Sequence, residues 1–233
     1  MVSSAMEDYL AAIFRTLLVQ EKATTSEVAR RLKVSAASAT QMFHKMASEG
    51  LVEYQEYSGV SLTDAGRRAA AAVVRRHRIA ERFLTDVLGI PWEKVDEMAD
   101  RLEHALPGEV VDSFEHLLGG ATHCPHGWPI PTPDGEVAPM DAHLLATLPS
   151  GAEGVVQWVE EDDPELLQYL ARHGLVPGAK VRVLSVNPVD DLMEVEVGGK
   201  TLPVGRRVST AVAVRRIEAP AGDTEHGAGE AAS

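Results

Sequence analysis

The chain has 233 residues, of which 45% are hydrophobic and 24% charged, and its formal net charge is −13 at pH 7. This apolar content excludes a largely disordered chain and is enough for two or three small folded domains. No apolar run approaches the roughly 18 residues that cross a bilayer, and no signal peptide is recognisable, so we expect a cytoplasmic protein without a membrane partner. The single cysteine, Cys124, excludes an internal disulfide.

Charge is unevenly distributed along the chain. Residues 1–90 contain 12 Lys and Arg against 10 Asp and Glu, whereas residues 91–233 contain 10 against 25. Because affinity for DNA comes mainly from neutralised phosphates, only the N-terminal third is suited to a polyanion. The acidic remainder is better suited to cations.

The first 65 residues have the pattern of three helices followed by two short strands. Apolar residues recur with helical period up to about Val19, a capping box opens a second helix at Thr24, and Ser35 caps a third helix over residues 36–48. Two short alternating strands follow, with a long helix after them. This order predicts a winged helix-turn-helix domain whose third helix enters the major groove of DNA.

The outward face of the third predicted helix is small at its leading end and polar beyond it, and Gln41 there can bind adenine through two hydrogen bonds. An ordinary solvated face is the alternative interpretation. The residues that we expect at the DNA are Ser35, Ala37, Ser38, Gln41 and Lys45, with Thr24 and Ser26 before them. Phosphate contacts are expected from Thr24, Ser26, Arg30, Arg31, Lys33 and Lys45.

Acidic residues and a histidine recur one turn apart in the predicted helix from Trp92 to Leu106. On such a helix Asp96, Asp100, Glu103 and His104 would share one face, which is a metal-ligand arrangement. Taken alone, an acidic face in contact with water is an equally good interpretation.

Two more pairs of ligand-capable side chains occur elsewhere. His77 and Glu81 lie one turn apart on a long helix predicted over residues 65–88, where a surface ion pair is the alternative. Cys124 and His126 are close enough in an irregular segment to bind one ion, although a Cys-x-His motif alone has low specificity.

Beyond about residue 148 the pattern changes to short alternating strands around a short helix, which predicts a small β-barrel. The helices over residues 65–118 are too apolar for one small chain, which indicates a dimer surface. Residues 219–233 are rich in Gly, Ala and Glu and are expected to form a disordered tail.

Four motifs occur together in this chain: Ser4-Ala5-Met6-Glu7-Asp8-Tyr9-Leu10, Arg76-His77-Arg78-Ile79-Ala80-Glu81-Arg82, Asp100-Arg101-Leu102-Glu103-His104 and Cys124-Pro125-His126-Gly127. In this order, after a winged helix and before a small barrel, they resemble the diphtheria toxin repressor family of iron- and manganese-activated transcriptional repressors. The resemblance covers about residues 3–218. It implies a mainly α fold with a winged helix-turn-helix domain at 1–64, a helical dimerisation and metal-binding domain at 65–140 and an SH3-like (FeoA-like) barrel at 141–218.

The same resemblance implies two metal ions per subunit. The main site would use Asp8, His77, Asp100, Glu103 and His104, and the ancillary site would use Glu81, Cys124, His126 and an acid of the barrel that we match to Asp163. Asp96 falls where some members place a further ancillary ligand. The chain departs from the manganese-selective members at Ala11, where these typically carry a carboxylate, and at Asp100, where they tend to have Glu.

Oxygen-rich sites that contain imidazole suit Mn²⁺, with Fe²⁺ as the alternative because it ranks higher in affinity alone. We therefore expect a manganese-activated homodimer, not an enzyme, that represses metal-homeostasis genes by binding a palindromic operator in double-stranded DNA. One alternative is a winged-helix regulator that responds to an organic ligand or a protein partner without metal. A metallohydrolase with the same ligands is the other, but it leaves the winged helix unexplained.

Overall fold

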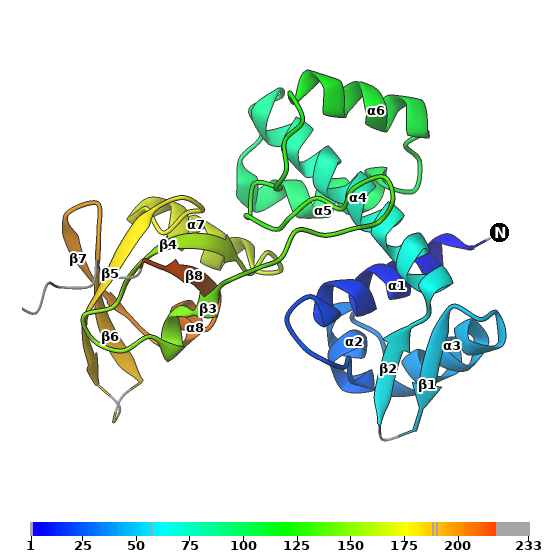
Figure 1. The fold of residues 1–233 in the computed structure, drawn as a ribbon, viewed down its shortest axis with the longest axis horizontal. Helices are drawn as coiled ribbons and strands as arrows, with labels where there is room; N and C mark the ends of the chain where they lie inside the picture. Colours follow the sequence, from blue (N-terminus) through cyan, green and yellow to red (C-terminus); the bar gives the residue numbers. More distant parts are fainter. Residues whose placement is uncertain (1, 57, 188, 190, 218–233) are drawn as a thin grey trace, which may run out of the picture. The chain divides into compact units, whose positions relative to one another are not determined.

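The computed structural model describes residues 2–56, 58–187, 189 and 191–217 (Figure 1). The tail predicted at 219–233 lies outside these residues. Internal contacts divide the chain into two units, one running to Met140 and including Glu160–Gln168, the other comprising Asp141–Val159 and the part that begins at Tyr169. The domain boundaries placed after residues 64, 140 and 218 remain a prediction.

The winged helix-turn-helix is present, and its helices begin at the capping residues read from the sequence. Its elements are α1 (Ser4–Leu17), α2 (Thr25–Arg31), α3 (Ala36–Ser48) and an antiparallel hairpin of β1 (Val52–Gln55) and β2 (Gly59–Leu62). Thr24 and Glu27 form a complete capping box at α2, and Ser35 caps α3. These local hydrogen bonds fix where the helices start, because the first N–H groups of a helix have no partner within it.

One hydrophobic core joins this domain to the long helix α4 (Asp64–Asp86). Ile13 and Phe14 of α1 and Phe43 of α3 are buried in it, and so are Ala70 and Val74 of α4. Because α4 shares the core, its start is packed rigidly against the DNA-binding helices. The rest of α4 contacts α5 (Val95–Leu102) and α6 (Gly108–Leu117), beside which it lies in Figure 1.

The helix predicted from Trp92 to Leu106 is shorter in the structure. A 3₁₀ turn at Trp92–Lys94 leads into α5, which ends at Leu102. Glu103 and His104 follow the last residue of α5. Glu103 still has α-helical dihedral angles, φ −56° and ψ −34°, and its N–H donates to the Ala99 carbonyl oxygen at 2.8 Å, so the helix ends gradually over these residues.

The second unit contains a six-stranded antiparallel sheet in the order β3-β8-β4-β5-β6-β7. Its strands are β3 (His143–Leu144), β4 (Glu153–Val159), β5 (Lys180–Asn187), β6 (Leu192–Val197), β7 (Lys200–Val204) and β8 (Val212–Arg216). The division between the units falls within α7 (Pro164–His173), and α8 (Arg206–Ser209) precedes β8. β3 and α8 were not predicted, because elements of two and four residues have no detectable period. Among the described residues no helix has the length and apolarity needed to cross a membrane.

Gly66 allows α4 to start directly against the backbone of Leu51. A Cβ at position 66 would lie 1.8 Å from the Leu51 carbonyl oxygen, which accepts a hydrogen bond from the Thr63 N–H at 3.1 Å. We expect Gly66→Ala to lower the free energy of unfolding by about 2–3 kcal/mol, because backbone has to move. The measurement is urea unfolding. Gly108→Ala is the control, since nothing lies within 4 Å of that position, and an equal loss in both variants would contradict the prediction.

Candidate metal centre

His77 of α4 lies at the centre of a cluster of carboxylates. Its ring is fully buried, and its Nδ1 lies 2.7 Å from Glu103 Oε2 and 3.3 Å from Asp100 Oδ1. On the other side of the ring, Nε2 lies 3.2 Å from Asp96 Oδ1 and 3.7 Å from Glu81 Oε1. Both nitrogens of one buried imidazole therefore face acids.

His104 lies on the other side of Glu103 and faces α1. Its Nε2 is 2.8 Å from Asp8 Oδ1 and 3.5 Å from Glu103 Oε1, and its Nδ1 is 2.7 Å from Glu7 Oε2. The Glu103 carboxylate thus has one oxygen toward each histidine. Glu7 was not predicted to be near the site, because an acid in the first turn of a helix already has an ordinary explanation in the helix dipole.

All five residues predicted for the main site come together, but as two adjacent groups. Asp8, Glu103 and His104 form one group, and His77, Asp100 and Glu103 form the other, with the donor atoms of each group within 4.8 Å of one another. Glu103 belongs to both groups, with its Oε2 toward His77 and its Oε1 toward His104. His77, Glu81 and Asp96 make a third group of the same kind.

The acids hold protons on the histidines. Burial and the charge of Arg15 lower the pKa of His77, but Glu81, Asp100 and Asp96 outweigh both and raise this pKa well above its usual value. Burial likewise lowers the pKa of His104, and hydrogen bonds to Glu7 and Asp8 reverse this shift, so that the net change is upward. The acids therefore favour the protonated form of each imidazole, whose charge offsets part of the carboxylate charge.

A second cluster consists of Glu81, Cys124, His126 and Glu161, all of them buried. His126 Nδ1 lies 3.0 Å from Glu81 Oε1, 4.0 Å from Cys124 Sγ and 3.9 Å from Glu161 Oε2. His126 Nε2 lies 2.9 Å from the Trp92 carbonyl oxygen. In a neutral ring Nε2–H would donate to that carbonyl and leave Nδ1 as the ligand atom, which is the usual outer support of a metal-binding histidine.

The segment that carries Cys124 and His126 is held against α4 by two arginines. Arg78 Nη1 donates to the Pro129 carbonyl oxygen at 2.6 Å, and Arg75 Nη1 donates to that of Pro131 at 2.8 Å. The pair is therefore placed by buried hydrogen bonds rather than by regular secondary structure. This placement could not be read from a Cys-x-His spacing.

The donor atoms of these clusters fit a divalent transition-metal ion. Both Glu81 oxygens, Glu161 Oε2, Asp96 Oδ1 and His77 Nε2 are buried without a hydrogen-bond partner, and the short contact of Glu81 with His126 is an ion pair that lacks hydrogen-bond geometry. Leaving a buried polar group unsatisfied costs about 1–3 kcal/mol, and more when the group is charged. An ion bound by these oxygen, nitrogen and sulfur atoms would remove that cost.

The acid that joins the second cluster is Glu161, whereas the sequence was matched at Asp163. The structure does not bring Asp163 to the cluster. Asp163 Oδ1 accepts a hydrogen bond from the Leu166 N–H at 3.1 Å, as a residue that caps α7. Residues 160–163 are all acidic, so only the buried position of Glu161 distinguishes it.

The side chains expected at the DNA are all exposed. Gln41 and Lys45 lie one turn apart on α3, and Ser35 caps this helix by accepting from the Ser38 N–H at 3.0 Å. Arg31 differs from the other residues expected at phosphates. Its Nη2 lies 3.0 Å from Glu160 Oε1 and 3.4 Å from Asp162 Oδ2, so the guanidinium is already paired with acids.

A winged helix-turn-helix whose first helix shares metal-donor clusters with the next helices defines a metal-dependent DNA-binding regulator. Comparisons with known proteins agree. The profile described as "Iron dependent repressor, N-terminal DNA binding domain" matches residues 1–60, "Iron dependent repressor, metal binding and dimerisation domain" matches 63–132, and "FeoA domain" matches 143–216.

Individual relatives extend this similarity over most of the chain. The iron-dependent repressor IdeR of Mycobacterium leprae (strain TN) is 32% identical over 226 residues, which are 91% of this chain and 96% of the relative. The diphtheria toxin repressor of Corynebacterium diphtheriae is 35% identical over 128 residues, 54% of this chain and 55% of the relative. The chain therefore belongs to the iron-dependent (diphtheria toxin) repressor family.

Solved structures support the same conclusion. One described as "Manganese-dependent transcriptional repressor complex with manganese" has a TM-score of 0.86 and 35% identity and covers 91% of this chain and 100% of that chain. Another, "Crystal Structure of ScaR with bound Zn2+", has a TM-score of 0.78 and 29% identity with coverage of 91% and 99%. The predicted family and fold class are confirmed, and the protein is a metal-dependent DNA-binding repressor, not an enzyme.

The assignment of Glu161 can be tested by two isosteric changes. We expect Glu161→Gln to weaken Mn²⁺ binding at the second cluster by about tenfold or more, because a charged ligand is lost. Asp163→Asn is the control and should leave Mn²⁺ affinity and stability nearly unchanged, since Asn caps a helix as well as Asp does. Competition with a chromophoric chelator measures both affinities. Loss of affinity in Asp163→Asn alone would return the ligand role to Asp163.

The raised pKa values predict that metal binding releases protons. Neighbouring acids raise the pKa values of His77, His104 and His126 above the usual histidine value, and burial together with Glu81 raises the pKa of the Cys124 thiol. A metal ion binds only the deprotonated forms, so the apparent Mn²⁺ affinity should rise as the pH increases above the usual histidine pKa of about 6.5. Calorimetry in buffers of different ionisation enthalpy measures the protons released. A binding enthalpy that is the same in every buffer would contradict the prediction.

Proposed function

We propose that the protein is activated by Mn²⁺, with two ions per subunit, and then binds a palindromic operator in double-stranded DNA as a homodimer. The observation that carries this proposal is the contact of Asp8, on the first helix of the DNA-binding domain, with His104 at 2.8 Å. The donor atoms of the group formed by Asp8, Glu103 and His104 come from α1 and from the residues that follow Leu102 of α5. A metal ion there would be held by the DNA-binding domain and the dimerisation helices together.

The choice of Mn²⁺ rests on the donors of the two main groups. Asp8, Asp100 and Glu103 supply carboxylate oxygens and His77 and His104 supply imidazole nitrogens, a set that suits Mn²⁺, with Fe²⁺ as the alternative. The similar solved structure with manganese supports the same choice.

At Ala11 the chain lacks the carboxylate that manganese-selective members of the family typically carry, and another acid of α1 lies near the site. Ala11 is buried in the core and supplies no ligand, but Glu7 brings a second carboxylate of α1 to the site through its contact with His104. We therefore include Glu7 among the groups that tune this site.

The carboxylates explain how a cation could act as a signal. Without a cation, Asp8 and the acids around His77 repel one another. Beside the clusters, α1 contacts the other helices through the ion pair of Glu7 with Arg76 and through His104. A bound ion would favour the arrangement in which these acids are close and would hold α1, and with it α3, against the middle of α4 and the end of α5. In a dimer this fixes the spacing of the two recognition helices, which suits two half-sites about one turn of DNA apart.

The dimer and DNA surfaces proposed here use exposed residues of the first unit. Large apolar side chains are exposed near the end of α4 and on α5 and α6, namely Val87, Leu88, Met98, Leu102 and Leu117. Their burial against a second copy would remove this apolar surface from water. Gln41 is the proposed base-reading residue of α3. A repressor that binds duplex DNA acts in the compartment that holds the DNA, which we propose is the cytoplasm.

The proposal is tested with duplexes selected from a random pool by the Mn²⁺-loaded protein. Fluorescence anisotropy should show at least about tenfold weaker DNA binding after chelation, within the usual range of coupling energies. The Asp8→Ala, His77→Ala double variant should bind DNA equally weakly with and without Mn²⁺. Glu97→Ala is the control, because among the described residues the ion-pair partner of Glu97 is Arg101 at the surface of α5. Equal affinity of the unaltered protein with and without Mn²⁺ would refute the proposed function.

A further inference from the structure

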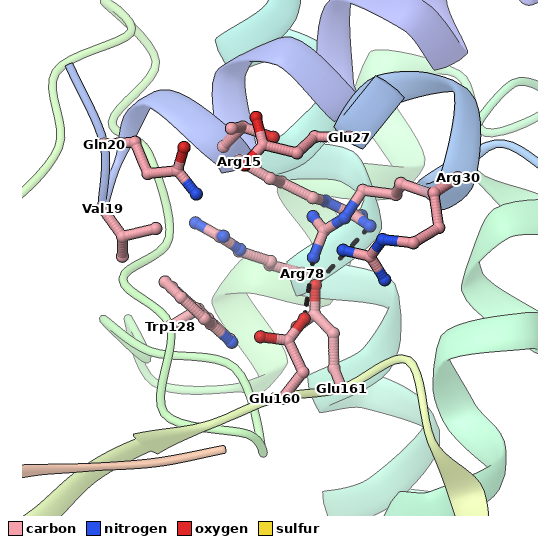
Figure 2. Close-up of a pocket in the computed structure, with 11 residues that line it drawn as sticks. Arg15, Val19, Gln20, Glu27, Arg30, Arg78, Trp128, Glu160 and Glu161 are labelled. Carbon is pink, nitrogen blue, oxygen red and sulfur yellow. Dashed lines mark hydrogen bonds and ion pairs between the residues drawn. The ribbon is translucent and has the colours of Figure 1, made fainter. Parts of the chain in front are cut away.

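Three consecutive acids, Glu160, Glu161 and Asp162, follow β4 and contact arginines of the DNA-binding helices; we call them the acidic tripeptide. Glu161 Oε1 lies 3.5 Å from Arg15 Nη1 of α1. Glu160 and Asp162 lie on either side of Arg31, the last residue of α2, at 3.0 and 3.4 Å from its Nη2. In Figure 2 the side chains of Glu160 and Glu161 point toward the arginines, and dashed lines mark the ion pairs.

These ion pairs are shielded from water. The side chains of Arg15, Arg31 and Glu161 are only 12%, 17% and 3% exposed. Arg15 Nε is buried without a hydrogen-bond partner, so the contact with Glu161 is an important compensation for the buried guanidinium. Ion pairs of this kind depend strongly on both partners, because removal of one leaves an uncompensated buried charge.

Glu161 belongs to this contact and to the second metal-donor cluster at the same time. Its Oε1 faces Arg15, while its Oε2, which has no hydrogen-bond partner, lies 3.9 Å from His126 Nδ1. The donor oxygen of Glu161 lies within 4.8 Å of that of Glu81. Two buried carboxylates so close repel each other, and a cation between them would favour the position of Glu161 seen here.

Arg31 places the other end of this chain of contacts next to the recognition helix. Only the residues from Leu32 to Ser35 separate it from α3, and Lys33 within them has a positive φ of 55°. A shift of the α2 end would reach the start of α3 through these four residues. The contacts thus run from a metal-donor cluster to the end of α2, directly before the connection to the proposed recognition helix.

We propose that the acidic tripeptide couples occupancy of the Glu81, Cys124, His126 and Glu161 cluster to the orientation of α1 and α2, with Arg15 and Arg31 as positioning residues. This inference rests on the proposed function, because it assigns a route to the metal signal. Arg31 then serves activation by holding α2 and does not serve as a phosphate contact. The acids remain paired with it when DNA is bound.

The test compares Arg31→Gln with Arg30→Gln, a neighbour on α2 that is exposed and has no ion pair with the acidic tripeptide in the described residues. Operator affinity is measured with and without Mn²⁺, and Mn²⁺ affinity is measured with and without DNA. We expect Arg31→Gln to reduce the Mn²⁺-dependent gain in DNA affinity by about tenfold while DNA affinity without metal changes by less than about twofold. Because coupling is reciprocal, DNA should raise the Mn²⁺ affinity of this variant by a correspondingly smaller factor.

The Arg31→Glu, Glu160→Arg double variant exchanges the charges of the pair and should restore much of the Mn²⁺-dependent gain in DNA affinity. Urea unfolding shows that each variant is folded. In Arg30→Gln the ratio of affinities with and without Mn²⁺ should stay as in the unaltered protein.

Two results would overturn the coupling. If Arg31→Gln weakens DNA binding by the same factor with and without Mn²⁺, Arg31 is a phosphate contact. If it leaves the gain intact, the acidic tripeptide has no part in activation. Both results require a Mn²⁺-dependent gain in the unaltered protein, whereas absence of that gain refutes the proposed function itself.

Discussion

Repulsion among closely spaced carboxylates is the constraint on which the rest of this structure depends. Two like charges 4 Å apart repel by about 4 kcal/mol at an effective dielectric constant of 20. The donor oxygens of Asp100 and Glu103 lie within 4.8 Å of each other, and so do those of Glu81 and Asp96. Neighbouring acids raise the pKa values of His77 and His104, so protonated imidazoles offset part of this repulsion. If these histidines bind the proposed metal ion, protons and the ion compete for the same nitrogen atoms.

Glu103 and His104, at the end of α5, connect this cluster to two other helices. Glu103 reaches back to His77 of α4, while His104 reaches Asp8 of α1. The Glu103 carboxylate also lies 3.5 Å from His104, so one carboxylate stands between the two histidines. Donor atoms of α1 and α4 are thereby brought to one place.

The parts of the fold that depend on local sequence could be predicted. Capping residues fixed the starts of α2 and α3, and the spacing of His77 and Glu81 on α4 placed them correctly, because these features depend on neighbours within one or two turns. Residues whose role depends on contacts with parts of the chain far away in sequence could not be predicted. Glu161 and Asp163 are chemically alike in sequence and differ only in burial. In the sequence, Arg31 has the features of a phosphate contact. Its pairing with Glu160 could not be read there, because the two residues are more than a hundred positions apart and only the fold brings them together.

The two kinds of cluster would impose different conditions on a bound ion. In the main groups the side chains of Asp8 and Asp100 are 46% and 59% exposed, so water can complete the coordination and the donors are oxygen and nitrogen. In the second cluster every donor is buried and one is the thiol of Cys124, whose pKa is raised by burial and by Glu81. An ion would enter there only by displacing protons from a thiol and an imidazole, and a thiolate favours softer metals than Mn²⁺. Under the proposed function, selectivity for a hard ion would therefore arise at the main groups, while the buried cluster would link an ion, through Glu161, to the acidic tripeptide beside α1 and α2.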